Sequence, residues 1–293
     1  MTSKRRGEKQ AAYQRRRKGG RDLFGATPKE IYMKDDTSST IIGRKTVGNG
    51  QQKVIMLHDW HGDHTLYTPI LPYLDGNTFH YAFADLPGYG LSRGHAGPAS
   101  IQQTASAIIA LADELDWPRF HIVGHSLSAM IAQYLAVLVP NRIDSLTAVC
   151  PIPASGSLAS DDALAFFAST ARDDDAFRRL IGYLSGQLSK GWTEAKRIRS
   201  RLASSPEVKM QYFGLFRTDF SQRLLGSTTK VNLILGDHDP GLDEATVAPL
   251  FRQWFDDLTV ETIVNCGHYP MEEAPPYFAT TLERLLKGTI GSL

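Results

Sequence analysis

A serine, two aspartates and a histidine of this chain have the types and the order of a nucleophilic catalytic site. Ser126 stands in the segment GHSLS at 124–128, between the apolar run 120–123 and a helical pattern that ends before Pro140. A strand that turns sharply into a helix at a serine exposes the hydroxyl, and small residues two positions to either side permit the turn. The segment predicts a nucleophile, although a serine that only caps the helix would leave the same pattern.

Two partners for this serine follow later strands. A serine hydroxyl needs a base to take its proton, and the base needs an acid that fixes its tautomer. His268 follows the last predicted strand, and Asp237 and Asp239 follow the strand before it. Alone, each aspartate could cap a helix and the histidine could be structural. Together, in the order serine, aspartate, histidine and each at a strand end, they predict a single site.

Alternating strands and helices position these residues. Short apolar runs predict strands over 30–33, 40–47, 53–57, 79–84, 120–123, 143–150, 231–235 and 258–264, with turn-rich residues 35–39 joining the first two. Between them lie an amphipathic segment over 66–74, a helix after Ser126, and helices over 101–115, 245–254 and 276–286. This alternation predicts an α/β fold whose sheet is parallel beyond its first hairpin.

An all-helical insertion interrupts the alternation. Helical patterns over 161–170, 174–184, 192–202 and 206–218 follow one another with no strand between them. Such an insertion must lie outside the sheet, so we expect a cap over the carboxyl ends of the strands, inserted after the sixth strand. The predicted domains are a basic tail over 1–25, a core over 26–154 and 226–293, and a cap over 155–225.

Composition favours a globular protein of a reducing compartment. The chain has 293 residues, of which 42% are hydrophobic and 22% charged, and no run reaches the roughly 18 apolar residues that cross a bilayer. The amino-terminal segment lacks the apolar stretch of a secretory signal. Cys150 and Cys266, the two cysteines, both lie near predicted strand ends. We therefore expect a cytoplasmic protein with buried thiols and no membrane partner.

The first 22 residues are strongly basic. Nine lysines and arginines face two acidic residues there, which leaves 23 basic and 29 acidic residues, or about −6, for the rest of the chain. Such a segment buries too little apolar surface to fold alone, so we expect it to be disordered. The segment fits a solvated tail, an extension from an early start codon or a transit peptide, and we do not expect it to bind nucleic acid.

The chain resembles the α/β-hydrolase family over about residues 27–288. The similar blocks are VIMLHDW at 54–60, DLPGYGLS at 85–92, GHSLS at 124–128, GDHD at 236–239 and GHYPME at 267–272. The resemblance implies an eight-stranded, mostly parallel sheet, no cofactor, and a Ser126–His268–Asp239 triad. In that family the acid is usually the third residue after the strand-end glycine, which selects Asp239 over Asp237. It also implies that the backbone amides of Leu127 and Trp60 form the oxyanion hole.

Two positions depart from the family pattern. Asp59 stands where the common His-Gly pair has glycine, and Ser128 replaces the second small glycine of the elbow. Because aspartate adopts positive φ only at a cost, we expect the loop around Asp59 to take a different path. Asp59, His61 and His125 are the residues expected to bind substrate.

The expected reaction is acyl transfer to water through an acyl-enzyme. The bond cleaved would be an ester, thioester, lactone or activated carbon–carbon bond of a small substrate, with water as the second substrate. Aromatic residues of the cap, which more often pack a cap onto its core, favour a mainly apolar pocket. Haloalkane dehalogenases and epoxide hydrolases of this fold place aspartate at the elbow, so Ser126 argues against both.

Three alternatives compete with this interpretation. His58, His61 and His64 could bind zinc, but His58 lies three residues before His61, where a metallo-β-lactamase motif needs two. A cofactor-free dioxygenase of the same fold uses a His/Asp dyad whose acid follows the strand before the cap, and here that strand ends at Cys150 with no carboxylate. The elbow, GHSLSAMI at 124–131, also resembles that of strigolactone and karrikin receptor hydrolases, in which slow hydrolysis serves signalling.

Overall fold

The computed structural model describes residues 34–36, 41–98, 100–185 and 188–288. The chain divides into two compact units, Met1–Tyr32 and Met33–Leu293, and everything that follows concerns the second unit. The predicted tail and the strand expected over 30–33 lie outside the described residues.

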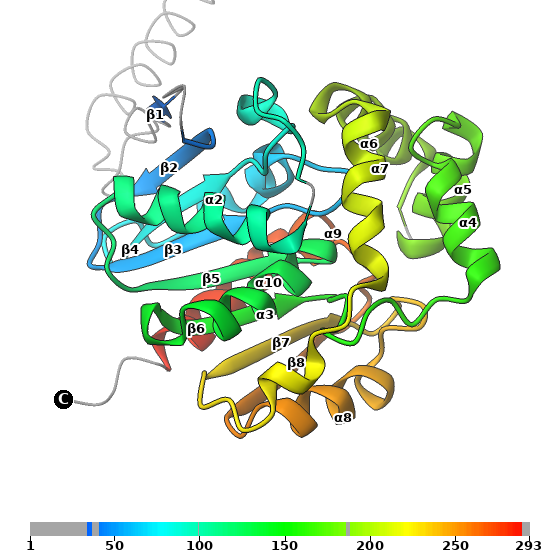
Figure 1. Ribbon diagram of the computed structural model, residues 1–293. Coiled ribbons are helices and arrows are strands. Elements are labelled where there is room, and N and C mark those ends of the chain that lie inside the picture. The colour runs from blue at the N-terminus through cyan, green and yellow to red at the C-terminus, as the bar shows by residue number, and fades with distance from the viewer. Residues whose placement is uncertain (1–33, 37–40, 99, 186–187, 289–293) are drawn as a thin grey trace, which may run out of the picture. The chain divides into compact units, whose positions relative to one another are not determined.

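One mixed sheet organises this unit, with its strands in the order β1-β2-β4-β3-β5-β6-β7-β8 (Figure 1). In the described part of the chain the strands are β1 Lys34–Asp36, β2 Arg44–Gly48, β3 Gln52–Leu57, β4 Phe79–Ala84, β5 Phe120–His125, β6 Ile143–Val149, β7 Val231–Gly236 and β8 Leu258–Ile263. Strands β3 to β8 pair in parallel, whereas β2 is antiparallel to both β1 and β4. The predicted mostly parallel sheet is confirmed.

The described part of the first hairpin includes residues that were expected in its turn. Strand β1 occupies residues 34–36, part of which was expected to be the turn, and Lys34 pairs with Thr46 of β2. Aspartate is depleted in strands, but pairing along an edge overrides that preference.

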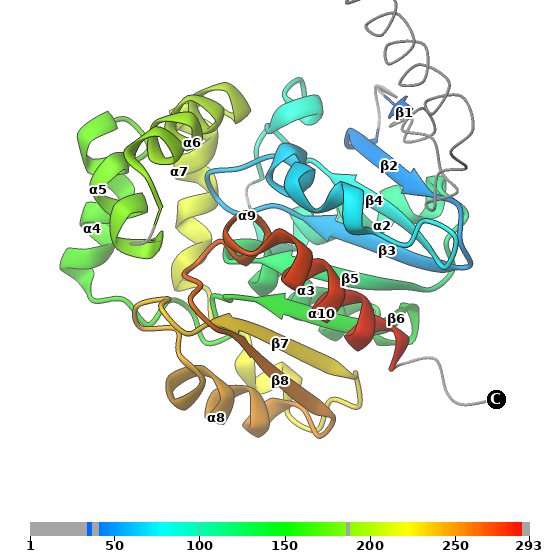
Figure 2. The same cartoon turned by 180° about the vertical axis from the view of Figure 1, so that it is seen from behind.

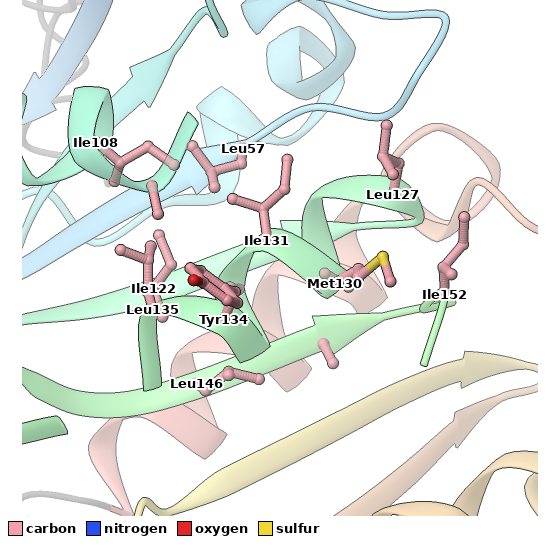
Figure 3. Close-up of a cluster of buried hydrophobic side chains, with 14 of the residues drawn as sticks. Leu57, Ile108, Ile122, Leu127, Met130, Ile131, Tyr134, Leu135, Leu146 and Ile152 are labelled. Atoms are coloured by element: carbon pink, nitrogen blue, oxygen red, sulfur yellow. The ribbon is translucent and has the colours of Figure 1, made fainter. Parts of the chain in front are cut away.

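Helices cover both faces of the sheet. On one face lie α2 (Ile101–Glu114), α3 (Leu127–Leu138) and α8 (Glu244–Trp254), and on the other lies α10 (Pro275–Lys287) (Figures 1 and 2). Because side chains alternate along a strand, Ile55 and Leu57 of β3 join the first cluster and Val54 and Met56 the second. Figure 3 shows part of the first cluster, where Ile131 of α3 points toward Leu57.

The amphipathic segment after β3 is a 3₁₀ helix over His64–Tyr73. Pro69 and Pro72 lie inside it. Proline has no backbone N–H to donate and crowds the preceding turn, which disfavours a regular α-helix. Leu66, Tyr67 and Ile70 are its buried face, so the predicted amphipathicity is confirmed although the helix type differs.

The helical insertion after the sixth strand is confirmed. It contains α4 (Asp161–Ser169), α5 (Asp174–Ser185), α6 (Lys190–Ala203) and α7 (Pro206–Phe213). The fourth predicted helix ends early, because Gly214–Arg217 continues as a 3₁₀ turn. Figure 1 shows these helices beyond the carboxyl ends of β5 and β6. Within the described ranges, no helix has the length and apolarity needed to cross a membrane.

Candidate active site

Ser126 occupies a strained turn between β5 and α3. Its φ is 56° and its ψ −117°, a region that a residue with a side chain occupies only when its surroundings impose it. Gly124 permits the turn, because a Cβ there would collide with the backbone of Ser128. The Ser126 hydroxyl accepts no capping hydrogen bond from α3. The serine is therefore not serving as the side-chain cap of this helix.

Ser126, Asp239 and His268 line one cavity of about 200 Å³. Core loops and cap residues share its walls. The apolar lining residues are Trp60, Ile152, Pro153, Leu158, Ala159, Phe167, Leu180, Leu184, Phe216, Pro240 and Leu242. The three residues expected at separate strand ends thus meet at a mainly apolar pocket.

Asp239 and His268 form a buried pair. Nδ1 of His268 lies 2.7 Å from Oδ2 of Asp239, so a proton on Nδ1 leaves Nε2 free to accept one. Burial would lower the pKa of His268, but the charge and hydrogen bond of Asp239 prevail and raise it. Asp237, the other candidate acid, instead accepts a hydrogen bond of 3.1 Å from the amide of Cys266.

His125 lies behind this pair and does not line the cavity, although it was expected to bind substrate. Its Nε2 donates to the carbonyl oxygen of His268 at 2.7 Å, and its ring centroid is 4.9 Å from that of His268. Burial, followed by the charge of His268, lowers the pKa of His125 to about 3. It is therefore a neutral donor that holds the His268 backbone.

Side-chain hydrogen bonds to four consecutive backbone carbonyls fix the loop that follows β3. The donor and the carbonyl that accepts are, in order, Tyr67 Oη and Leu57 at 2.9 Å, Ser128 Oγ and His58, His58 Nδ1 and Asp59 at 2.7 Å, and Tyr89 Oη and Trp60 at 2.8 Å. Nε2 of His58 accepts from the amide of Leu86 at 3.1 Å, which leaves the proton on Nδ1. The loop is thus anchored at every one of these peptides.

This anchoring orients the Trp60 amide. In a trans peptide the N–H points away from the carbonyl before it, so fixing the Asp59 carbonyl turns the Trp60 N–H to the opposite side. Among the described residues, neither this amide nor that of Leu127 has an acceptor. Asp59 is not among the residues with positive φ, so its backbone does not carry left-handed strain.

A family model described as alpha/beta hydrolase family matches residues 54–281, more than three quarters of the chain. The chain belongs to the alpha/beta hydrolase family. A solved bromoperoxidase from Bacillus anthracis is similar in fold, with a TM-score of 0.75 at 16% identity over 87% of this chain and all of that one.

Two curated relatives are similar in sequence to this hydrolase-family chain. A pimeloyl-acyl-carrier protein methyl ester esterase of Pectobacterium carotovorum is 26% identical over 80% of this chain and 94% of that protein. The dihydrolipoyllysine-residue acetyltransferase component of the acetoin cleaving system of Cupriavidus necator is 26% identical over 82% of this chain. This chain spans only 65% of that second relative.

His61 lines the cavity, but both of its ring nitrogens form hydrogen bonds to residues of the helical insertion. Its Nε2 lies 3.0 Å from Thr170 Oγ1 and its Nδ1 3.2 Å from Ser200 Oγ. Thr170 donates its own proton to the Phe167 carbonyl, so Nε2 of His61 is the donor to Thr170. Burial keeps the pKa of His61 well below its ordinary value. This neutral ring joins the core loop to the cap.

The histidines considered for zinc do not converge. Among the described residues, the group of three potential ligands that comes together is Cys150, Asp239 and His268, with ligand atoms within 4.8 Å of one another. Cys150 and Cys266 are both buried and unpaired. Burial raises the pKa of the Cys150 thiol well above its usual value, which disfavours the thiolate that binds metals.

Two buried residues near the site were missed from the sequence. Lys196 lies 3.6 Å from the ring centroid of Tyr269, and Tyr269 donates to Asp59 at 3.3 Å. A usable signal exists for Lys196, because it stands at helical spacing from Trp192 and Ser200 on the inward face of its helix. Tyr269 follows His268 directly and carried no periodic signal.

Proposed function

We propose that this protein is a serine hydrolase that cleaves an ester-like bond of a small, mainly apolar substrate through an acyl-enzyme. The observation that carries the proposal is the strained Ser126 in one cavity with the buried His268–Asp239 pair. The similarity to methyl ester esterases supports ester cleavage.

In the proposed mechanism, His268 takes the Ser126 proton on Nε2 as Oγ attacks the substrate carbonyl. Asp239 holds the ring and stabilises the imidazolium. The amides of Leu127 and Trp60 receive the oxyanion, each worth about 2.7 to 4 kcal/mol of transition-state stabilisation. The imidazolium then protonates the leaving group as the carbon–oxygen bond breaks.

The second half of the cycle consumes water. His268 takes a proton from water, whose oxygen attacks the acyl carbon, and then returns that proton to Ser126 as the carboxylic acid departs. We assign residues 155–225 as the cap of this cavity and residues 26–154 and 226–293 as the catalytic core. Two unpaired cysteines suit a cytoplasmic location.

The test is a comparison of wild type and Ser126→Ala with an aromatic ester. We expect wild type to release an initial burst of the aromatic alcohol and the variant to lose the burst and at least 99% of turnover. Ser169→Ala, which alters an exposed cap serine, is the matched control and should keep wild-type rates. A Ser126→Ala protein of wild-type activity would refute the nucleophile.

Turnover also separates this proposal from its alternatives. A receptor-like hydrolase would stop after a single slow turnover, whereas the proposed enzyme turns over many times. A dioxygenase would consume oxygen with a heteroaromatic substrate and would not need Ser126. The acid paired with His268 is Asp239 after β7, where a serine hydrolase of this family usually carries it.

A further inference from the structure

Asp59 places a carboxylate in the cavity wall with almost no partners. The residue is 3% exposed and lines the cavity together with Ser126 and His268. Its Oδ2 accepts one long hydrogen bond of 3.3 Å from Tyr269, and its Oδ1 has none. In the described part of the chain it forms no ion pair.

Such a carboxylate is costly to bury unless something binds it. A carboxylate offers about four acceptor sites, and burial without hydrogen bonds is strongly unfavourable. Burial acts to raise the pKa of Asp59, yet the nearby charge of Lys196 holds it below the usual range. Lys196 itself pairs with Glu272 at 3.1 Å, and Glu272 also pairs with Arg199 at 2.7 Å. Asp59 is thus ionised beside Lys196 without a direct ion pair to it.

The surrounding loop is built to hold this carboxylate. A Cβ on Gly62 would collide with Oδ1 of Asp59, so glycine at 62 provides the room that the carboxylate occupies. The Gly62 amide donates to the Asp59 carbonyl at 3.3 Å. The glycine absent at 59 is therefore matched by a glycine three residues later.

We propose that Asp59 binds a hydrogen-bond donor carried by the acyl part of the substrate, either a hydroxyl or an ammonium group. This inference rests on the proposed hydrolase function and narrows its substrate class. A donor that reaches this carboxylate from the cavity would add to the one long hydrogen bond that Oδ2 accepts, whereas an acyl chain bearing a carboxylate would put two negative charges in one small cavity. The preferred substrates are hydroxy- or amino-acyl esters, and half-esters of dicarboxylic acids are rejected.

The experiment uses aryl esters that share one leaving group. The acyl groups are butanoyl, its hydroxy- and amino-substituted forms, the matching methoxy forms, and succinyl. We expect wild type to prefer a donor-bearing ester over its methoxy analogue by about tenfold or more in kcat/KM. In Asp59→Asn the preference for the amino ester should be lost, the hydroxy preference should shrink, and succinyl ester cleavage should rise about tenfold.

A second test variant and a control variant complete the experiment. Gly62→Ala keeps the carboxylate but displaces it, and it should also reduce the donor preference. Asp63→Asn alters a neighbouring carboxylate that caps the 3₁₀ segment and does not line the cavity, so it should keep the wild-type preference.

Asp59 also acts on His268, whose pKa it helps to raise, and the design separates this effect. Removing the charge should move the acid limb of the kcat/KM profile to lower pH for every ester equally. Donor binding changes the ratio between esters at one pH. An unchanged ratio in Asp59→Asn, with butanoyl ester still cleaved, would overturn the inference and leave the hydrolase proposal standing.

Binding measured without turnover keeps the inference testable if no ester is cleaved. The Ser126→Ala protein should bind the hydroxy or amino ester about tenfold more tightly than the methoxy analogue. The double variant that adds Asp59→Asn should lose the amino preference. Equal affinities in both proteins would overturn the inference independently of hydrolysis.

Discussion

Single side chains connect the loops of the proposed site, and Ser128 is an example. It stands where the family pattern has glycine, and its buried hydroxyl donates to the His58 carbonyl. This bond fastens the elbow to the loop that carries the Trp60 amide. Glycine at this position would allow the same turn but could not make the connection. We therefore propose that Ser128 is a positioning residue that links the two proposed oxyanion donors.

Replacing Ser128 by glycine or alanine should weaken the oxyanion site more than substrate binding. We expect kcat to fall by about tenfold to a hundredfold with KM nearly constant, because a displaced donor acts in the transition state. Affinity for a boronic acid, which mimics the tetrahedral adduct, should fall in parallel. Denaturant unfolding of the same variants measures how much folding stability they lose. A loss of stability with unchanged kcat and unchanged boronic acid affinity would contradict the positioning role.

At the scale of elements, one chain of hydrogen bonds ties three cap elements to the core. Lys209 Nζ in α7 donates to Ser200 Oγ in α6 at 2.9 Å, and that hydroxyl meets His61 Nδ1 at 3.2 Å. His61 then donates to Thr170, which ends α4. Trp60 Nε1 adds a bond of 2.7 Å to the Lys209 carbonyl. The cap is thus held by buried polar groups as well as by apolar packing.

Lys209 should make cap stability depend on pH. Burial lowers its pKa to about 7, whereas an unfolded lysine titrates near pH 10.4. Between these values the unfolded chain holds a proton that the folded chain has lost, so this group makes stability rise with pH and adds no slope below about pH 7. Relative to Lys209→Met, wild type should gain about 1.4 kcal/mol of unfolding free energy per pH unit between pH 8 and 10.

Denaturant unfolding at several pH values measures this slope. Lys190→Met, which alters an exposed lysine of the same cap, is the matched control and should run parallel to wild type. If the unfolding free energies of Lys209→Met and wild type changed in parallel with pH, Lys209 would keep its proton in the folded protein.

How far the sequence predicts the structure differs between elements and site. The strands β3 to β8 and helices α2, α3 and α8 fall close to their predicted ranges, because each has a simple apolar period. The 3₁₀ segment differs in helix type from the prediction, because its prolines interrupt the regular helical period. The short helix α9 (Pro270–Glu273) was not predicted, because four residues are too few to show a period. Ser126, Asp239 and His268 could be predicted to lie together, as they do around one cavity, because parallel strands bring their carboxyl ends to one edge.

The remaining site features depend on neighbours distant in sequence. Asp59 and Gly62 fit each other only once the loop is folded, and Lys209 is buried only because a cap helix packs onto the core. His125 was expected to bind substrate, yet side chains alternate in direction along a strand and this one faces the His268 backbone. No local pattern carries such information.

At the scale of the whole molecule, the strongly basic segment and the residues of the proposed site lie in different parts of the sequence. The first 22 residues carry nine basic and two acidic residues, or +7, and the rest carries about −6. The family match begins only at residue 54, and the described residues of the proposed site belong to the unit Met33–Leu293. The basic segment should therefore affect where the protein binds without affecting what it cleaves.

Removing residues 1–32 should leave the fold and the hydrolase reaction intact. We expect kcat/KM to stay within about twofold of the full chain and the melting temperature to change little, since no proposed site residue is lost. Retention on a polyanion such as heparin should fall, because lysines and arginines displace counterions from phosphate or sulfate groups. A full-length variant with Arg15, Arg16 and Arg17 changed to Gln separates charge from length and should lose part of this retention. A truncated protein that unfolds, or that loses ester cleavage while remaining folded, would show that the basic segment belongs to the catalytic unit.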